Sequence, residues 1–217
     1  MVIVVIGSPH GRHTAQGIAA AGVAVTIGRV AAAAGAEVQL VGKVGEGPAG
    51  DAVLLAMAHD RVGHVAVLRD ASTPTPLAAD VAGGDALLEP EGDEPPDTHP
   101  DEAAGPALDS GDLELALRYL PDYRVLVVAH PLDANALATV VAAGRWAEAQ
   151  LIVVVASGAT APGLPDDATV LEAPAHNADG AFAAVVGAYA AALDRGASPA
   201  DAFASASAES GWAAVSD

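Results

Sequence analysis

The sequence predicts an α/β fold in which helices flank a central, mainly parallel β-sheet. Short runs of consecutive apolar residues alternate along the chain with longer, alanine-rich segments of helical spacing. Runs such as Val2–Ile6 and Leu151–Val155 lack polar alternation, so they indicate parallel strands that are buried on both faces. Apolar residues make up 52% of the 217 residues, which suffices for the core of a single domain over 1–217.

The predicted strands are short and are bounded by glycine, proline or charged residues. They cover Val2–Ile6, Val38–Val44, Val65–Leu68, Arg124–Ala129, Leu151–Val155 and Val170–Ala173. Gly83 and Gly84, between Leu77–Val81 and Ala86–Leu88, predict an additional hairpin. Strands that alternate with helices along a chain imply parallel pairing through crossover connections.

The predicted helices begin and end at residues that are typical of helix ends. They cover Ile18–Ala34, Pro48–Asp60, Asp112–Leu120, Asp133–Ala147, Ala181–Arg195 and Ser198–Ala214. Gly35 and Gly196 follow two of them, and Pro48 and Pro199 begin two others. Between these elements, many acids and five prolines predict a loop at about residues 89–111, either a solvated connection or an acidic binding segment.

Charge and composition exclude several functional classes. The chain has a formal net charge of −19, with 9 basic against 28 acidic residues, and Lys43 is its only lysine. Such a surface repels phosphate backbones and anionic lipids, so we expect neither a nucleic-acid nor a membrane partner. There is no cysteine, which excludes disulfides, thiolate metal sites and a cysteine nucleophile. The apolar first strand lacks the basic start of a signal peptide, and we expect a cytoplasmic protein.

Two stretches carry motifs whose order and spacing are informative. The first stretch contains Ala21-Gly22, Thr26, Ala34-Gly35-Ala36, Gly42-Lys43-Val44-Gly45-Glu46, Gly50 and Thr73-Pro74-Thr75. The second contains Val155-Ala156-Ser157-Gly158 and Asn177-Ala178-Asp179-Gly180-Ala181-Phe182. Together these stretches resemble the PfkB family of carbohydrate kinases, which has the ribokinase-like fold. The resemblance implies a three-layer α/β domain that binds a sugar or nucleoside and uses ATP with Mg²⁺.

The resemblance also implies where the site residues lie. Binding of nucleotide or of another anion is assigned to Asn177, Ala178, Gly180 and Gly158. Substrate binding is assigned to His10, Arg12, Gly22 and Thr26. The family's catalytic base is an aspartate, but the ungapped alignment puts Gly180 there and Asp179 where the family's last anion-hole glycine stands. Asp179 either acts as the base after a shift of one residue or caps the following helix.

Other departures from the family pattern also concern the kinase chemistry. The family's Asn-x-x-Glu motif is absent, and Ala156 replaces a threonine that contacts nucleotide. Only 14 residues separate Gly7 from Gly22, so we expect the lid strands over the substrate to be reduced or absent. We therefore predict a divergent homologue, weak or inactive as a kinase, that binds a small ligand or a protein partner. The alternative is an active sugar or nucleoside kinase that uses Asp179 as its base.

Histidines at the predicted strand ends offer a competing site. His10, His13, His130 and His176 follow predicted strands, and with Asp133 or Asp179 they could hold a metal ion or transfer protons. Their spacing matches no known metal motif, so they are interpreted as polar loop residues and no metal site is predicted. A homodimer is a further hypothesis, with the region Leu77–Leu88 as its interface. Trp146 is expected to pack in the core.

Overall fold

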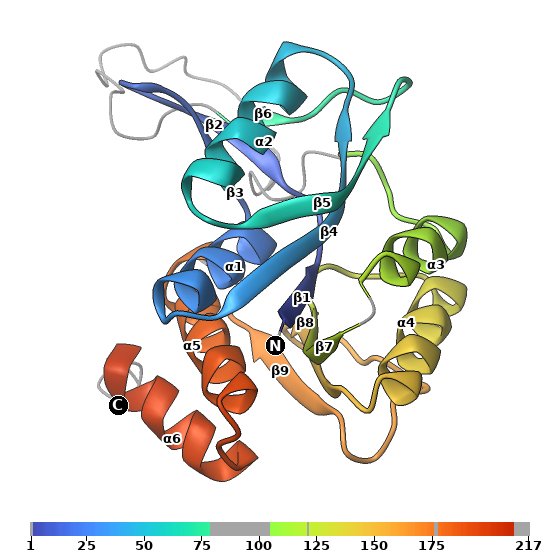
Figure 1. The fold of residues 1–217 in the computed structure, drawn as a ribbon, viewed down its shortest axis with the longest axis vertical. Helices are drawn as coiled ribbons and strands as arrows, with labels where there is room; N and C mark the ends of the chain where they lie inside the picture. Colours follow the sequence, from blue (N-terminus) through green and yellow to red (C-terminus); the bar gives the residue numbers. More distant parts are fainter. Residues whose placement is uncertain (1, 79–104, 121, 176–177, 211–217) are drawn as a thin grey trace, which may run out of the picture.

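The computed structural model describes residues 2–78, 105–120, 122–175 and 178–210 of the chain, and in residues 178–179 and 209–210 only the backbone. Its main sheet has six strands, all parallel, in the order β5-β4-β1-β7-β8-β9 (Figure 1). These strands are β1 (Val2–Ile6), β4 (Glu37–Gly45), β5 (Gly63–Asp70), β7 (Tyr123–Val128), β8 (Gln150–Ala156) and β9 (Thr169–Ala173). Because β4 and β7 flank β1, the chain winds outward from the centre in both directions.

Helices cover both faces of this sheet and complete three layers (Figure 1). The helices are α1 (Val23–Ala33), α2 (Pro48–His59), α3 (Ser110–Arg118), α4 (Ala134–Trp146), α5 (Ala183–Asp194) and α6 (Pro199–Ser210). One face carries α1, α2, α5 and α6, and the other carries α3 and α4. This is the architecture that the sequence predicts.

The alternation of side chains along β1 explains why its sequence is apolar throughout. Ile3 and Val5 pack in the core under α1 and α5, whereas Val4 and Ile6 pack in the core under α3 and α4. All four side chains are fully buried. A polar residue at any of these positions would therefore face one of the two cores, which is typical of a central parallel strand.

The predicted helix Ile18–Ala34 is wrong at its beginning. Residues 10–21 instead form an antiparallel hairpin of β2 (His10–Thr14) and β3 (Gly17–Ala21), and α1 starts only at Val23. Gly22, with φ of +107°, separates β3 from α1. The alanine-rich residues of β3 are extended because they pair with β2. The segment between Gly7 and Gly22 is thus long enough for two short strands.

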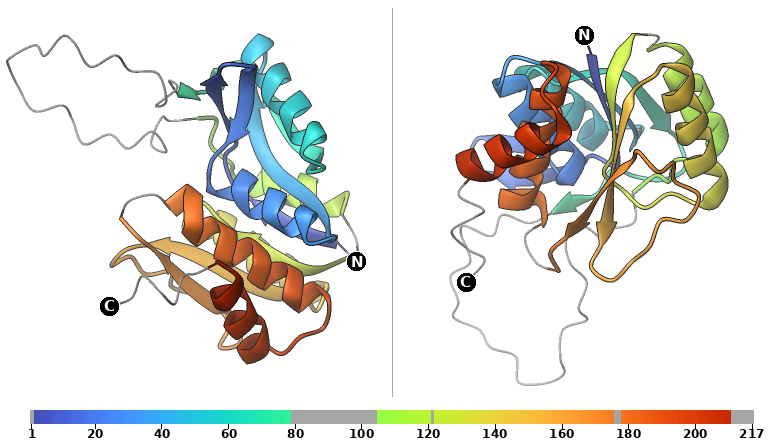
Figure 2. Two further views of the ribbon diagram at one scale, coloured as in Figure 1. Left: turned by 90° about the vertical axis from the view of Figure 1, so that its left-hand side faces the viewer. Right: turned by 90° about the horizontal axis from the view of Figure 1, so that it is seen from below.

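These two strands belong to a second, three-stranded sheet of order β3-β2-β6, with β6 at Leu77–Ala78. We call it the small sheet; it lies beside α2, at the end of the molecule where β4 and β5 terminate (Figures 1 and 2). Gly11 of β2 faces α2, because a Cβ on it would overlap Leu77 and Ile18 and lie 3.3 Å from Val53 Cγ2. Short strands are therefore present at the place where the sequence predicts that lid strands are reduced or absent.

A tight corner connects the small sheet to the main sheet. Gly45, the last residue of β4, donates its N–H to Thr75 Oγ1 at 2.8 Å, and Thr75 is buried. A Cβ on Gly45 would lie 2.5 Å from Thr73 O, and a Cβ on Gly50 of α2 would overlap Gly45 O. The Gly45, Gly50 and Thr73-Pro74-Thr75 motifs of the sequence thus meet in one place, and glycine is required because backbone contacts backbone there.

Some predictions fall partly outside the described residues. The hairpin around Gly83 and Gly84 and most of the loop at residues 89–111 lie there, as does the end of the last predicted helix beyond Ser210. The helix predicted to begin at Asp112 begins at Ser110, because Asp109 caps it by accepting from Asp112 N. Among the described residues, no helix is both long and apolar enough to span a membrane.

Candidate functional site

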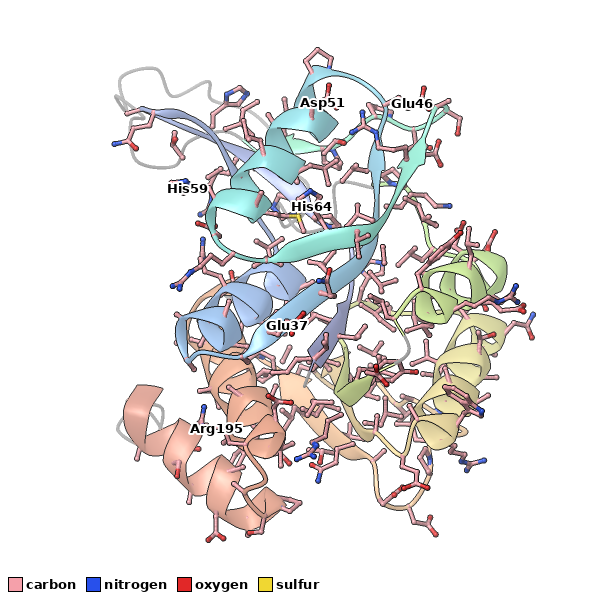
Figure 3. The ribbon with its side chains drawn as sticks, viewed as in Figure 1. Glu37, Glu46, Asp51, His59, His64 and Arg195 are labelled. Carbon is pink, nitrogen blue, oxygen red and sulfur yellow. The ribbon has the colours of Figure 1, made fainter. Side chains whose placement is uncertain are left out.

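Some of the residues predicted to bind a ligand follow the carboxyl ends of parallel strands: His10 follows β1 and Gly158 follows β8. In Figure 3, Glu46 follows the carboxyl end of β4 and Glu37 marks its beginning, which fixes the direction of the strand. In an open α/β sheet, ligands bind beyond the carboxyl ends, near the point where the chain reverses its winding. Here that point is β1, with the turn at Gly7 and the N-terminus of α1 beside it.

His10 and Gly22, both predicted to bind substrate, lie in contact with each other. A Cβ on Gly22 would lie 3.1 Å from His10 Nδ1 and 3.3 Å from Ser8 O, and its positive φ also favours glycine. Strand alternation places Arg12 on the same face of the small sheet as His10, opposite the face that Gly11 turns toward α2. The structure thus brings His10, Arg12 and Gly22 into one neighbourhood.

Thr26 lies one helical turn after Gly22 and is 7% exposed. Its N–H donates to Gly22 O at 3.0 Å, and its hydroxyl accepts a long hydrogen bond of 3.5 Å from Arg29 Nη2. This threonine therefore stabilises the first turn of α1 in the described state. A direct contact between Thr26 and a substrate stays a prediction.

The start of the α5 segment carries the predicted catalytic and anion-binding residues. Ala178–Phe182 form a wide helical turn that is broken at Gly180, whose φ of −91° and ψ of −116° are not helical. Asn177 lies outside the described residues, as does the side chain of Asp179. The backbone therefore has a kink, followed by α5, where the resemblance predicts an anion hole. The roles of Asn177, Ala178, Asp179 and Gly180 stay predictions.

The turn after β8 contains a contact that the sequence analysis missed. Parallel pairing sets Glu172 of β9 beside Val155, so that its carboxylate reaches the turn at Ser157-Gly158. Oε1 of Glu172 accepts from Ser157 Oγ at 2.7 Å and from Gly158 N at 2.9 Å. These hydrogen bonds, with that from Ser157 the stronger, hold the pKa of Glu172 below its ordinary value of 4.5. In the sequence, only Glu172 itself could have indicated this contact, because it is the one acidic residue in the segment Thr169–Ala173.

The only lysine is also engaged within the protein. Lys43 of β4 forms an ion pair with Asp112 Oδ2 of α3, and its side chain is 14% exposed. Asp112 at the same time closes the cap of α3 by accepting from Asp109 N at 3.0 Å. At the end of β5, hydrogen bonds from the Ser72 hydroxyl and from the N–H groups of Ser72 and Thr73 lower the pKa of Asp70. Lys43 and Asp70 are thus both held by partners within the protein.

These residues do not fit ATP well in the described state. The N–H of Gly158, predicted to bind an anion, already donates to the carboxylate of Glu172. Lys43 is neutralised by Asp112, so it offers no free positive charge to a phosphate. A polyphosphate would have to displace Glu172 and would approach a surface rich in carboxylates. The described residues therefore support no catalytic step that uses ATP or Mg²⁺.

No metal centre is found among the described residues. No three histidine, cysteine, aspartate or glutamate side chains in that part of the chain lie close enough together to hold an ion. His10 and His130 each have an interaction partner, whereas His176 lies outside the described residues. The hypothesis of a histidine site at the strand ends thus receives no support from the described histidines.

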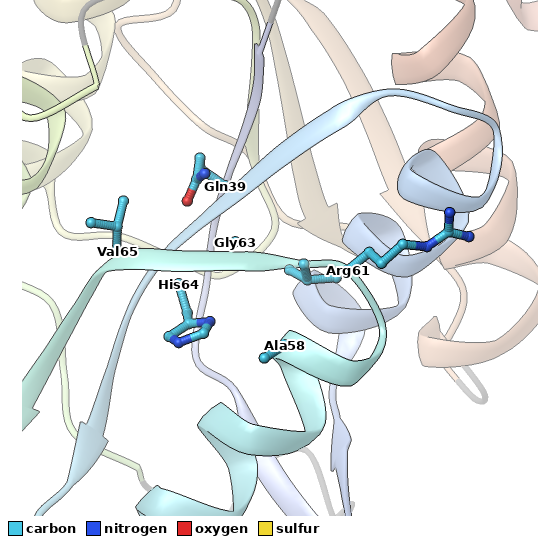
Figure 4. A pocket seen from close by; sticks show the side chains of 7 residues that line it. Gln39, Ala58, Arg61, Gly63, His64 and Val65 are labelled. Atoms are coloured by element: carbon cyan, nitrogen blue, oxygen red, sulfur yellow. The ribbon is translucent and has the colours of Figure 1, made fainter.

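A hollow of about 510 Å³ lies elsewhere, at the amino end of β5. Gln39 Oε1 and His64 Nδ1 in its lining are buried without a hydrogen-bond partner. Figure 4 shows these two side chains on opposite sides of β5, with Arg61 pointing away from both. Because the polar atoms do not converge, the hollow lacks the arrangement of a ligand site.

Another hollow, of about 560 Å³, separates α3 from α4 on the outer surface. Trp146 lies on its rim and is 78% exposed, so the prediction that this tryptophan packs in the core is wrong. Tyr123 forms part of the floor, and burial raises the pKa of its hydroxyl. Side chains of α3 and α4, together with Tyr123, line this hollow, and none of the predicted site residues is among them.

The fold has close counterparts among solved structures. A ribokinase from Arabidopsis thaliana, complexed with ribose and ATP, superposes with a TM-score of 0.60 at 15% identity, over 96% of this chain and 90% of the other. A PfkB protein from Polaromonas sp. JS666 gives a TM-score of 0.64 at 14% identity, over 100% and 96%. A longer sugar kinase from Pyrococcus horikoshii is covered over only 53% of its length.

No protein-family model and no curated protein matches the chain. The likeness to the ribokinase from Arabidopsis thaliana and to the PfkB protein from Polaromonas sp. JS666 extends along the whole chain at very low identity. It shows that the chain has the ribokinase-like fold, as the motifs predicted. Activity and substrate do not follow from a shared fold.

Proposed function

We propose that this protein is a ribokinase-like protein that binds a small hydroxylated ligand and transfers phosphate from ATP weakly or not at all. The observation that carries the proposal is the helix start at Ala178–Phe182. The position aligned with the catalytic base is Gly180, which has no group to accept a proton, and the backbone is kinked at this residue. Asp179, one residue earlier, stands where a phosphate would need an uncharged donor.

The ligand would lie between the small sheet and the N-terminus of α1. His10 and Arg12 supply donors from one face of the small sheet, and Gly22, which has no side chain, leaves room for the His10 ring at the helix start. Arginine and histidine donors suit the hydroxyl groups of a sugar or nucleoside. A protein partner, including a second copy of the chain, is an additional proposal for the exposed end of the small sheet, where Leu77 is 42% exposed.

One observation favours the alternative, an active kinase. Two strands fit between Gly7 and Gly22, and strands at that place would help to exclude water from a phosphoryl group. If Asp179 then acted as the base, phosphotransfer would proceed despite the glycine at 180.

The test is a phosphotransfer assay in which the purified protein is incubated with ATP, Mg²⁺ and a panel of sugars and nucleosides. We expect ADP to form no faster with an acceptor than without one, and Asp179→Asn to change nothing. Asp167→Asn, an exposed acid just before β9, is the matched control for the lost charge. Acceptor-dependent ADP formation that Asp179→Asn abolishes and Asp167→Asn preserves would establish the kinase alternative. Since a general base contributes about 10²–10⁴-fold to rate, that loss would be plain.

A further inference from the structure

Two donors converge on one oxygen at the turn after β8. The hydroxyl of Ser157 and the N–H of Gly158 both point to Glu172 Oε1, at 2.7 and 2.9 Å. Gly158 has a φ of +74°, and a Cβ on it would meet no atom within 4 Å. Two donors that converge on one oxygen form the geometry that receives an oxyanion, and here that oxygen belongs to a carboxylate of the protein itself.

The oxygen that accepts from this donor pair belongs to Glu172 of the neighbouring strand β9. Glu172 is exposed on β9, an edge strand of the main sheet, and the register of β8 with β9 holds it opposite Val155. A carboxylate oxygen and a phosphate oxygen make the same demands on a donor, since both are anionic acceptors of short hydrogen bonds. An external phosphate at this turn would lose both donors to Glu172 and would also face its negative charge.

The contact of Glu172 with Ser157 and Gly158 lies where it can affect which ligands bind. The turn lies at the carboxyl end of β8, on the edge of the sheet where ligands of open α/β folds bind. We infer that Glu172 is an internal anion that occupies the donor pair at Ser157-Gly158, where the sequence predicts anion binding, and thereby excludes external polyphosphates from this strand end. The inference deepens the proposed function, on which it rests, by naming the residue that makes the site unreceptive to ATP.

Replacement of Glu172 tests the inference without requiring any catalysis. Glu172→Ala frees both donors and removes the charge, whereas Glu172→Gln removes the charge and keeps an oxygen acceptor in place. We expect Glu172→Ala to bind ATP and inorganic tripolyphosphate at least about tenfold more tightly than the wild-type protein, since a charged competitor for two donors is lost. Glu172→Gln should gain less. Calorimetry gives the affinities, and thermal unfolding verifies that each variant is folded.

A control variant and an NMR measurement at Gly158 distinguish the loss of the Glu172 contact from a general change in net charge. Asp167→Ala removes one exposed acid near the opposite end of β9, and its affinity for tripolyphosphate should stay near that of the wild type. In ¹⁵N-labelled protein, the amide resonance of Gly158 should move on addition of tripolyphosphate in Glu172→Ala but not in the wild type. An affinity unchanged in Glu172→Ala, an equal gain in Asp167→Ala, or a Gly158 shift in the wild type would overturn the inference.

These outcomes are independent of the phosphotransfer assay. Efficient, acceptor-dependent phosphotransfer by the wild type would contradict the proposed function, yet a gain of affinity in Glu172→Ala would still establish the internal anion. Absence of phosphotransfer together with unchanged affinity in Glu172→Ala would retain the proposed function and refute the role of Glu172.

Discussion

Gly187→Ala should lower the free energy of unfolding by about 1–3 kcal/mol, although alanine is the better helix former. Gly187 lies in α5 where this helix packs against α1. A Cβ on it would lie 2.6 Å from Ile27 O and 2.9 Å from Val30 Cβ. The first of these atoms is backbone, so the two helices would have to move apart to make room. Such a movement would loosen the core that α1 and α5 share with β1.

The comparison with Gly144→Ala isolates this steric effect from helix propensity. Gly144 lies within α4, and the nearest atom to a Cβ there is Leu126 Cδ2 at an ordinary contact distance of 3.5 Å. Gly144→Ala should therefore leave stability unchanged or raise it by up to about 1 kcal/mol. Urea denaturation of both variants provides the measurement. Equal stability changes for the two substitutions would mean that α1 and α5 are not in this close contact.

Gly50→Ala should destabilise the protein by about 3 kcal/mol, at the upper end of the usual range for overpacking. A Cβ at this position in α2 would overlap the carbonyl oxygen of Gly45 and would also lie 3.1 Å from Thr75 Oγ1. This carbonyl oxygen belongs to the backbone of Gly45, the last residue of β4, so it cannot rotate away as the end of a side chain would. The hydrogen bond from Gly45 N to Thr75 would be strained with it.

Because this corner joins the two sheets, the effect should extend to the small sheet. Hydrogen exchange should rise in β2 and β6 of Gly50→Ala under conditions that leave β7 and β8 protected. Gly111→Ala, in the first turn of α3, is the matched control, since its Cβ would approach only the end of the Asp109 side chain, at 3.3 Å. Wild-type stability in Gly50→Ala would refute the tight corner.

The main sheet could be predicted because its signal is local. Val2–Ile6 is a strand at the predicted residues, since five consecutive apolar residues before a glycine suit little except a central parallel strand. α2 was predicted at its observed start because Pro48 favours the first turn of a helix. Ile18–Ala21 was not, since an alanine-rich run favours a helix in isolation and only the partner strand β2 makes it extended.

The candidate site was harder to predict, because its contacts depend on pairing between distant segments. Gly22 and the Gly45–Thr75 corner carried motif signals, whereas the contact of Glu172 with Ser157 follows only from the register of β8 with β9. The ion pair of Lys43 with Asp112 likewise joins β4 to α3 across a stretch of almost 70 residues. Composition had indicated a surface unsuited to phosphates, and these contacts identify the residues responsible.

The most direct test of the account is a calorimetric titration of the wild-type protein with ATP and Mg²⁺, at moderate and at high salt. An acidic strand edge with its donors occupied predicts a Kd above about 1 mM in both buffers. High salt would screen the net charge of −19 and would leave the contact of Glu172 with Ser157 and Gly158 in place. Binding with a Kd of about 10 µM in either buffer would contradict the central claim that this strand edge no longer receives a nucleotide.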